Sequence, residues 1–326
     1  MNRTAVRLAV ALAGAAVVAQ ALLVPLFVAP AANMGPRDLP VAVAGPPQAV
    51  EAISARLAAQ EGAFEVVTAA DGSAADELIK NRDVYAALVV TPTGAEVHTA
   101  PAASATVAAL FTTAAQELAS AQGQQVKVVT VVPLPADDPR GGGFVAGFLP
   151  LLLTGMLAGI LLVVLVPVPR VRLLGLLGYA VGSGLIGALV LRDWLGVISG
   201  NYLADAGAIS LLGLAAAGLV TGLGSVFGPP GIGLGAITVF LVGNPLSGVA
   251  GAPELLPQPW GEIGQHLPAG AGATLLRSVA FFDGSGGAYA AGVLAVYALG
   301  GLLLTALRKA PASTPQPEPV REPVAA

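Results

Sequence analysis

The stretch FVAGFLPLLLTGMLAGILLVVLV, from Phe144 to Val166, decides the fold class of this chain. It carries no charged side chain over more than the roughly 20 residues that an α-helix needs to cross the hydrocarbon core of a bilayer. Similar apolar stretches run from Leu173 to Leu191, from Ala206 to Phe227 and from Ala288 to Leu307. We therefore expect an integral membrane protein built mainly of helices.

The composition of the whole chain agrees with that expectation. Of its 326 residues, 55% are hydrophobic and only 10% are charged, with a mean hydropathy of +0.79. A formal net charge of -4 offers no basic surface for phosphate groups, which argues against a nucleic-acid partner. The absence of cysteine excludes disulfides and thiolate metal sites. Abundant Ala and Gly with little Lys is typical of a GC-rich bacterial genome.

The N-terminal segment, residues 1–29, is predicted to be a first transmembrane helix. Arg3 and Arg7 precede an uncharged stretch from Leu8 to Ala29, whose only strongly polar member is Gln20. A cleaved signal peptide is the alternative, but its apolar region is typically about 7 to 15 residues long, shorter than this one. We favour an uncleaved anchor.

Residues 30–143 have the character of a soluble α/β domain. Short β-branched or aromatic runs alternate with amphipathic segments, a pattern that predicts a small mixed or parallel sheet covered by helices. The expected strands are Val41–Ala44, Phe64–Thr68, Tyr85–Val90 and Val126–Val132. The expected helices are Pro47–Gln60, a segment capped by Asp71, and Thr106–Ala121.

Residues 144–309 are predicted to form a second membrane region of five helices. Its fourth apolar stretch, Ile232 to Val242, is too short to cross a bilayer unless it begins near Pro229 and ends near Leu246. We therefore expect a broken or partly re-entrant helix there. Residues 310–326, rich in Pro and Glu, are expected to be a disordered cytoplasmic tail. The prediction is an all-α membrane bundle of about six transmembrane helices with an inserted extracytoplasmic α/β domain.

The distribution of basic residues predicts the orientation. Six alternating spans place both termini, the loop near residue 170 and the turn near Pro229 on one side of the membrane. Arginine and lysine pairs mark that side, which the positive-inside rule assigns to the cytoplasm. The pairs are Arg3 and Arg7, Arg170 and Arg172, and Arg308 and Lys309. Residues 30–143 are therefore expected outside.

Sites for ATP and dinucleotides are not indicated. None of the lysines Lys80, Lys127 and Lys309 stands in a phosphate-binding loop of the form G-x-x-x-x-G-K-[ST]. The glycines from Gly231 to Gly235 imitate part of a dinucleotide motif, but they lie in a membrane stretch, where close helix packing is the better explanation. The same explanation applies to Gly155 and Gly159, and to Gly182 and Gly184.

Catalytic and proton-carrying groups are also not indicated. His98 and His266 have no neighbouring carboxylate or second histidine at ligand spacing, so no metal, no cofactor and no enzyme active site are predicted. The predicted spans contain no Asp, Glu, Lys or His, which are the residues that proton-driven pumps bury in their helices. This argues against a proton-driven antiporter.

The most informative loop runs from Asn244 to Gly284, between the last two predicted spans. It contains NPLSG from Asn244 to Gly248, LPAGAG from Leu267 to Gly272, and LRSVAFFDG ending at Gly284. One interpretation is a surface lid of short helices, held at the membrane interface by Trp260 and the pair Phe281 and Phe282. The other is a re-entrant gate, because broken helices at membrane depth bury against protein or line a cavity.

These three motifs resemble the last extracellular loop of ABC-2-type permease-like membrane proteins, in particular the phage-infection-protein-like branch. The resemblance implies a permease fold with a first span, a large external domain and five C-terminal spans. It also implies a path for a hydrophobic or lipid-like compound, a separate ATPase, and a homodimer or heterodimer in the bacterial plasma membrane. The short loop from Pro167 to Leu173 departs from that pattern by offering an ATPase little surface.

The alternative is a non-transporting envelope protein whose external domain binds a cell-wall component, a phage or a partner protein. For the permease interpretation, six loop residues are the candidates for a transport path or gate, and a pair between Arg277 and Asp283 is expected at its outer mouth. The candidates are Asn244, Pro245, Trp260, Arg277, Phe281 and Asp283.

Overall fold

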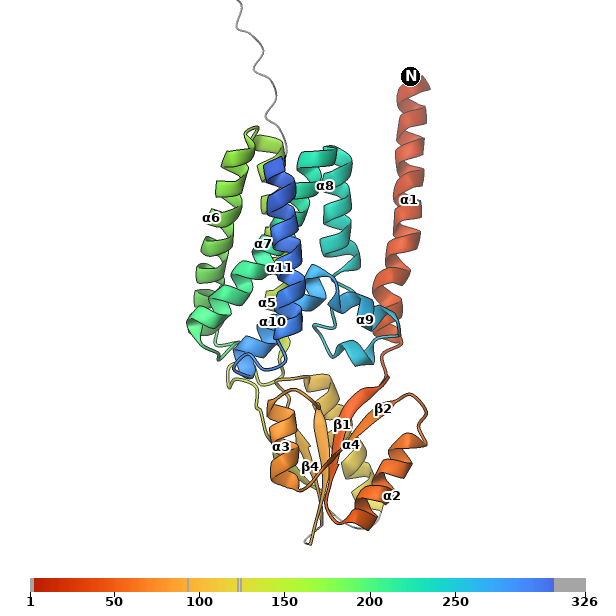
Figure 1. Cartoon of the computed structure of the whole chain (residues 1–326). Helices are drawn as coiled ribbons and strands as arrows, with labels where there is room; N and C mark the ends of the chain where they lie inside the picture. The colour runs from red at the N-terminus through yellow and green to blue at the C-terminus, as the bar shows by residue number, and fades with distance from the viewer. Residues whose placement is uncertain (1–2, 93, 122, 124, 308–326) are drawn as a thin grey trace, which may run out of the picture.

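The computed structural model describes residues 3–92, 94–121, 123 and 125–307, and is mainly helical. Five of its helices are long and apolar enough to cross a membrane, which indicates a multi-pass membrane protein (Figure 1). They are α1 (Arg3–Ala32), α5 (Gly142–Leu165), α6 (Pro169–Ala188) with its π-helical extension η1 (Leu189–Trp194), α7 (Tyr202–Phe227) and α11 (Ala288–Leu307).

Helix α7 is the centre of the bundle, and α5, α6, α8, α10 and α11 all pack against it. Small residues bring the backbones together. A Cβ atom on Gly159 would lie 2.7 Å from the carbonyl oxygen of Ala217, and one on Gly301 would overlap the backbone of Gly218. The predicted packing role is confirmed for Gly159, whereas Gly182 faces open space. Close approach of backbones is the usual basis of helix association in membranes.

The fourth predicted stretch forms a short helix, α8 (Pro229–Ala236), that continues into π-helical η2 (Ile237–Val242). At about 1.5 Å per residue this segment covers only about 20 Å, less than the hydrocarbon core. Its glycines pack as predicted at two of three positions: Gly231 and Gly235 press against the backbone of α7, and Gly233 is open. Six spans therefore remain a prediction.

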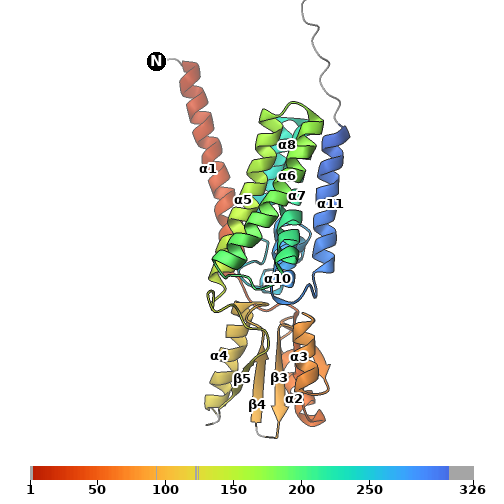
Figure 2. The same cartoon turned by 90° about the vertical axis from the view of Figure 1, so that its left-hand side faces the viewer.

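Helix α1 stands apart from the other helices (Figures 1 and 2). None of its most apolar window is buried inside the protein, and its aliphatic side chains are exposed along its length. Coverage is confined to its C-terminal third, where Leu23, Leu26 and Phe27 are half-buried and Pro30 is buried. The start of α1 and the end of α11 lie at the same end of the molecule, opposite the α/β region.

The α/β region is a five-stranded mixed sheet in the order β2-β1-β3-β4-β5. Strand β1 is parallel to β2 and β3, β4 is antiparallel to β3, and β5 is parallel to β4. Helix α3 packs on one face; α4, with Leu57 of α2, packs on the other. The elements are β1 (Leu39–Ala44), α2 (Pro47–Ala58), β2 (Phe64–Ala69), α3 (Gly72–Lys80), β3 (Ala86–Thr91), β4 (Gly94–Thr99), α4 (Ala105–Ala121) and β5 (Lys127–Thr130).

All four predicted strands and all three predicted helices of this region are present within a few residues, and Asp71 caps α3 by accepting from the Ala74 amide at 2.8 Å. Strand β4 was not predicted. Val97 and His98 are both buried, so the strand has no alternation of apolar and polar residues by which to recognise it. The expected basic pair Arg308 and Lys309 and the tail 310–326 lie outside the described residues.

Candidate binding site at the junction of the two regions

The loop from Asn244 to Gly284 folds into three short helices, η3 (Pro253–Leu255), α9 (Trp260–Gln265) and α10 (Pro268–Phe281). Helix α10 is buried along most of its length and packs against α7 and α11. The sequence of α10 explains this position, because the run from Ala269 to Ala273 contains only Ala and Gly. Such small residues let helix backbones approach closely. This burial inside protein favours the re-entrant interpretation over the surface lid.

The same loop joins the apolar cores of the two regions. Phe282 is 5% exposed and packs into the cluster on the α3 face of the sheet, whereas Leu255 packs into the cluster on the α4 face. Phe281 lies 5.7 Å from the Phe144 ring of α5. Phe282 therefore lies inside the protein, and the expectation that it anchors the loop at the membrane interface is wrong. Through Leu255 and Phe282, the loop packs against both faces of the sheet and forms a clamp between the α/β region and the bundle.

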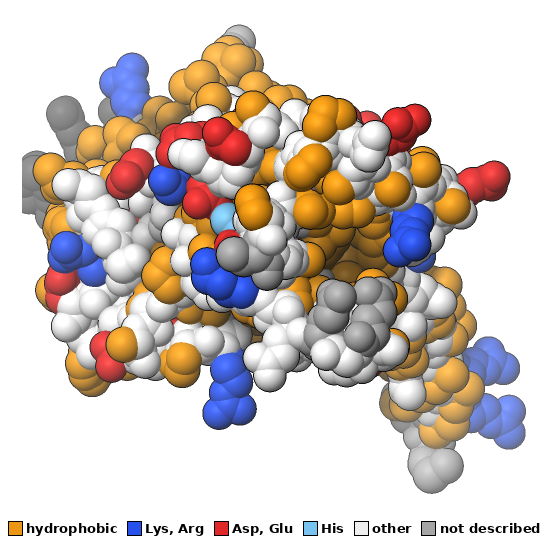
Figure 3. Space-filling model, turned by 90° about the horizontal axis from the view of Figure 1, so that it is seen from below, with side chains coloured by type: hydrophobic (Ala, Val, Ile, Leu, Met, Phe, Trp, Pro, Cys, Tyr) orange, Lys and Arg blue, Asp and Glu red, His pale blue; other side chains and the backbone are white. Residues whose placement is uncertain are grey.

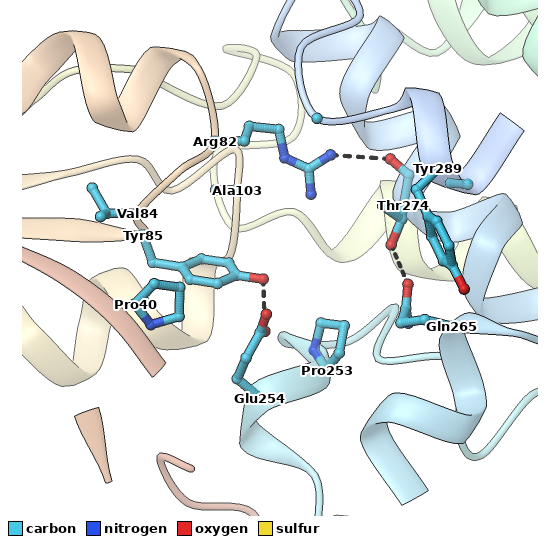
Figure 4. Close-up of a pocket in the computed structure, with 12 residues that line it drawn as sticks. Pro40, Arg82, Val84, Tyr85, Ala103, Pro253, Glu254, Gln265, Thr274 and Tyr289 are labelled. Carbon is cyan, nitrogen blue, oxygen red and sulfur yellow. Dashed lines mark hydrogen bonds between the residues drawn. The ribbon is translucent and has the colours of Figure 1, made fainter. Parts of the chain in front are cut away.

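A cavity of about 240 Å³ lies at this junction, lined by residues from both regions (Figure 4). From the α/β side, the Arg82 guanidinium donates to the Thr274 carbonyl at 3.1 Å, and the Tyr85 hydroxyl donates to Glu254 at 2.8 Å. From the bundle side, the Thr274 hydroxyl donates to Gln265 at 2.6 Å. Hydrogen bonds therefore cross-link the polar side chains in the wall of this cavity, which also contains apolar residues such as Val84 and Ala103.

Burial shapes the charges of this cavity. It raises the pKa of the Tyr85 hydroxyl, and the Glu254 carboxylate raises that pKa further. Burial also lowers the pKa of Arg82, whose guanidinium lies 5.4 Å from the centre of the Phe282 ring. Among the described residues, Arg82 has no carboxylate within ion-pair distance. The Arg82 cation, which lines this cavity, therefore contacts the Thr274 carbonyl and the Phe282 ring.

A second cavity, of about 360 Å³, lies beside the first and is lined by Arg277, Phe281 and Phe144. Arg277 is 8% exposed, donates to the Val249 carbonyl at 2.8 Å, and stacks 4.9 Å from the centre of the Phe144 ring. The expected pair between Arg277 and Asp283 is wrong, because Asp283 is exposed and the described ion pairs do not include it. Arg277 turns instead toward a backbone carbonyl and an aromatic face.

Two further pockets lie between the junction and α1, the second of them a mainly apolar crevice beside α1. A pocket of about 790 Å³ shares Glu254 and Gln265 with the junction cavity. It shares Arg37 with the crevice, which has a volume of about 610 Å³ and is lined by Leu26 and Trp260. Pockets with charged lining residues and a crevice lined mainly by apolar residues thus lie next to one another around η3 and α9.

The six candidate residues do not form one site. Arg277 and Phe281 line the second cavity, and Trp260, 48% exposed, lines the crevice beside α1. Asn244 and Pro245 are half-buried in the turn after η2, where the Asn244 carbonyl accepts from the Ser247 hydroxyl at 2.8 Å. Sequence reasoning missed Arg82, Tyr85 and Glu254, because the α/β domain was treated separately from the loop that it contacts.

His98 has carboxylate neighbours, contrary to expectation. Its Nδ1 atom lies 2.6 Å from Asp76 and its Nε2 atom 3.3 Å from Glu96, which also receives the Lys127 ammonium group. Lys127 lowers the pKa of Glu96 through that hydrogen bond. Seen from the α/β end, acidic and basic side chains are interspersed (Figure 3). A cluster of at least three side chains suited to a metal ion is not found within the described ranges.

The expectation of spans without acidic residues is also wrong. Helix α7 begins four residues before the predicted start at Ala206, and its span includes Asp205, which is fully buried. At the other end of the bundle, Arg172 of α6 is 4% exposed and donates to Ser225 at 2.8 Å and to the Val163 carbonyl at 2.9 Å. The bundle therefore encloses charged residue types near both of its ends.

Comparisons of this chain with protein families, with curated proteins and with solved structures find no match.

Proposed function

We propose that this chain is a bacterial plasma-membrane protein that binds a hydrophobic or lipid-like compound where its external α/β region meets the bundle. In this proposal both termini are cytoplasmic, residues 30–143 lie outside, and α8 with η2 completes a set of six membrane segments. The position of both described ends opposite the α/β region supports that topology. Arg3, Arg7 and Arg170 support the assignment of that end of the bundle to the cytoplasm.

One observation carries the binding proposal: pockets that contain charged and polar side chains lie next to a crevice lined mainly by apolar ones, and neighbouring pockets share lining residues. An amphiphile needs a polar site for its head and an apolar surface for its chain. Arg82, Gln265 and Tyr289 offer the first, and the crevice between α1 and Trp260 offers the second. Because α1 is separated from the other helices over most of its length, the crevice is accessible from the side that faces lipid.

We further propose that binding serves export, with a separate ATPase supplying energy and two permease chains forming the transporter. The loop motifs that resemble ABC-2-type permeases support this step, as does the insertion of α10 into the bundle. The second candidate is a non-transporting envelope protein that displays its α/β region. The clamp formed by Leu255 and Phe282 favours that candidate, because it holds the region in a fixed position above the bundle.

The binding proposal is tested with a photoreactive fatty-acyl probe added to the full chain in lipid nanodiscs. Ala29→Trp fills the crevice and should reduce labelling of the peptide that contains Trp260 severalfold. Leu12→Trp places the same side chain on the exposed, remote part of α1 and should leave labelling unchanged. Equal labelling of Ala29→Trp and the parent chain would refute the proposed site.

Export is tested separately, by purifying the tagged chain from native membranes in mild detergent. Recovery of a stoichiometric ATPase, with ATP hydrolysis in the eluate, would support the permease role. Recovery with envelope proteins and without ATPase would favour the display role, even if the crevice binds the probe.

A further inference from the structure

Asp205 is a buried acid that the proposed binding site does not use. It lies in the first turn of α7 and its exposed fraction is 0%. Neither carboxylate oxygen has a hydrogen-bond partner among the described residues. The usual explanation for an acid at this position, capping of the helix, does not apply, because the Asn201 side chain already accepts from the Leu203 and Ala204 amides at 3.0 and 3.3 Å.

The carboxyl group faces the C-terminal end of α10 across Gly200. A Cβ atom on Gly200 would lie 2.8 Å from Oδ1 of Asp205 and would also overlap the Val279 carbonyl oxygen. That carbonyl belongs to the last turn of α10, where the Phe282 and Gly284 amides both donate to Ser278 instead. Among the described residues, the Val279 carbonyl thus has no donor and the Asp205 carboxyl group has no partner. Both groups lie beside Gly200.

The charged groups around Asp205 do not neutralise it by direct contact. Arg192 of η1 donates to the Gly200 carbonyl at 2.8 Å and pairs with Asp193 at 2.7 Å. Arg277 of α10 is engaged by Val249 and an aromatic ring. Helices α5, α8 and α11 contribute no charged residue in their described spans, and the arginines of α6, Arg170 and Arg172, lie near the opposite end of that helix.

A bare carboxylate in this position is unfavourable for two reasons. A buried charge without a partner costs several kcal/mol. In addition, the carbonyl end of α10 carries a partial negative charge that repels an anion and opposes the favourable effect of the α7 N-terminus. A neutral carboxyl group removes both penalties and supplies the hydrogen that the Val279 carbonyl lacks.

We propose that Asp205 is a proton-binding site inside the bundle, protonated in this conformation and donating its hydrogen to the Val279 carbonyl. Loss of the proton to water breaks that hydrogen bond and leaves an anion facing the end of α10, which drives α10 away from α7. Helix α10 also carries Thr274 and Arg277, which line the junction cavities. Protonation of Asp205 therefore controls the shape of those cavities, whatever ligand they bind.

The test is infrared spectroscopy of the full chain in nanodiscs near pH 7, with aspartate labelled by ¹³C in the side-chain carboxyl group. We expect a band from a protonated carboxyl group that shifts with the label. It should vanish in Asp205→Asn and persist in Asp193→Asn, the matched control on η1, where the carboxylate is partly exposed. The absence of a label-sensitive band in the wild-type chain overturns the proposal without any variant.

The pH dependence of thermal unfolding gives a second readout. A proton held only by the folded state stabilises it at low pH, and this contribution is lost as the pH rises. The melting temperature of the wild-type chain should therefore fall relative to that of Asp205→Asn as the pH rises above about 4, the ordinary pKa of an aspartate side chain in an unfolded chain. The same melts are repeated with and without Na⁺ at fixed ionic strength. If Na⁺ raises the melting temperature of the wild-type chain but not that of Asp205→Asn, Asp205 is part of a cation site and the proton site is overturned.

Discussion

Replacing Phe282 with alanine should release the α/β region from the bundle. The side chain is 5% exposed, packs into the α3-face cluster and receives the Arg82 guanidinium on its ring. Truncation of a buried phenylalanine costs about 3–5 kcal/mol. At about 1.4 kcal/mol per factor of ten, the open junction should become about 140 to 3,700 times more populated when the whole cost falls on docking.

The chain contains no cysteine, so single reporter cysteines can measure this opening. A cysteine at Ala103, 4% exposed and lining the junction cavity, should react with a thiol reagent at least a hundredfold faster when Phe282→Ala is present. A second reporter at Ala215, in the core of the bundle, should stay slow, which distinguishes undocking from unfolding.

Trp260→Ala is the control, because Trp260 is half exposed and removing it leaves the junction packed. A labelling rate at Ala103 within threefold of the parent would refute the argument that Phe282 holds the two regions together. Equal acceleration of both reporters would show that the clamp is part of one cooperative unit with the bundle.

Three further predictions concern separate parts of the molecule. Gly301→Val should prevent α11 from packing on α7 and abolish a monodisperse peak in detergent gel filtration, whereas Gly300→Val, which faces open space, should not. Tyr85→Phe should lower the free energy of unfolding by about 1–3 kcal/mol, measured by denaturant titration, because it leaves the half-buried Glu254 carboxylate without its donor. Because Lys127 lowers the pKa of Glu96, Lys127→Met should be less stable than wild type at pH 7, and the difference should disappear as the pH falls below about 4 in thermal melts.

The regular elements could be predicted because each depends on local pattern. Long uncharged runs identify the long membrane helices, and short β-branched runs identify four of the five strands. Strand β4 is the exception, because its buried His98 is a polar residue held by contacts with Glu96 and Asp76 rather than by apolar character. A pattern of residue types does not reveal a polar group that finds its partner only after folding.

The candidate site could be predicted only in part, because it forms between segments far apart in the chain. Arg277 and Phe281 were recognised from loop motifs, but their contacts with Val249 and Phe144 were not. The hydrogen bond from Tyr85 to the loop joins residues 169 positions apart. Asp205 was missed because apolar runs do not mark where a helix begins, and the Asn201 cap starts α7 earlier than its hydrophobic run.

The glycines and alanines around α7 also limit how the bundle can move. Side chains with several rotamers can absorb a displacement by repacking, but Gly159, Ala217 and Gly301 have no rotamers to change. Neighbouring helices in such a bundle slide as rigid bodies or bend at irregular turns. The π-helical segments η1 and η2 are irregular turns of this kind, and η2 packs against α10, so we expect the bundle to bend at these two segments.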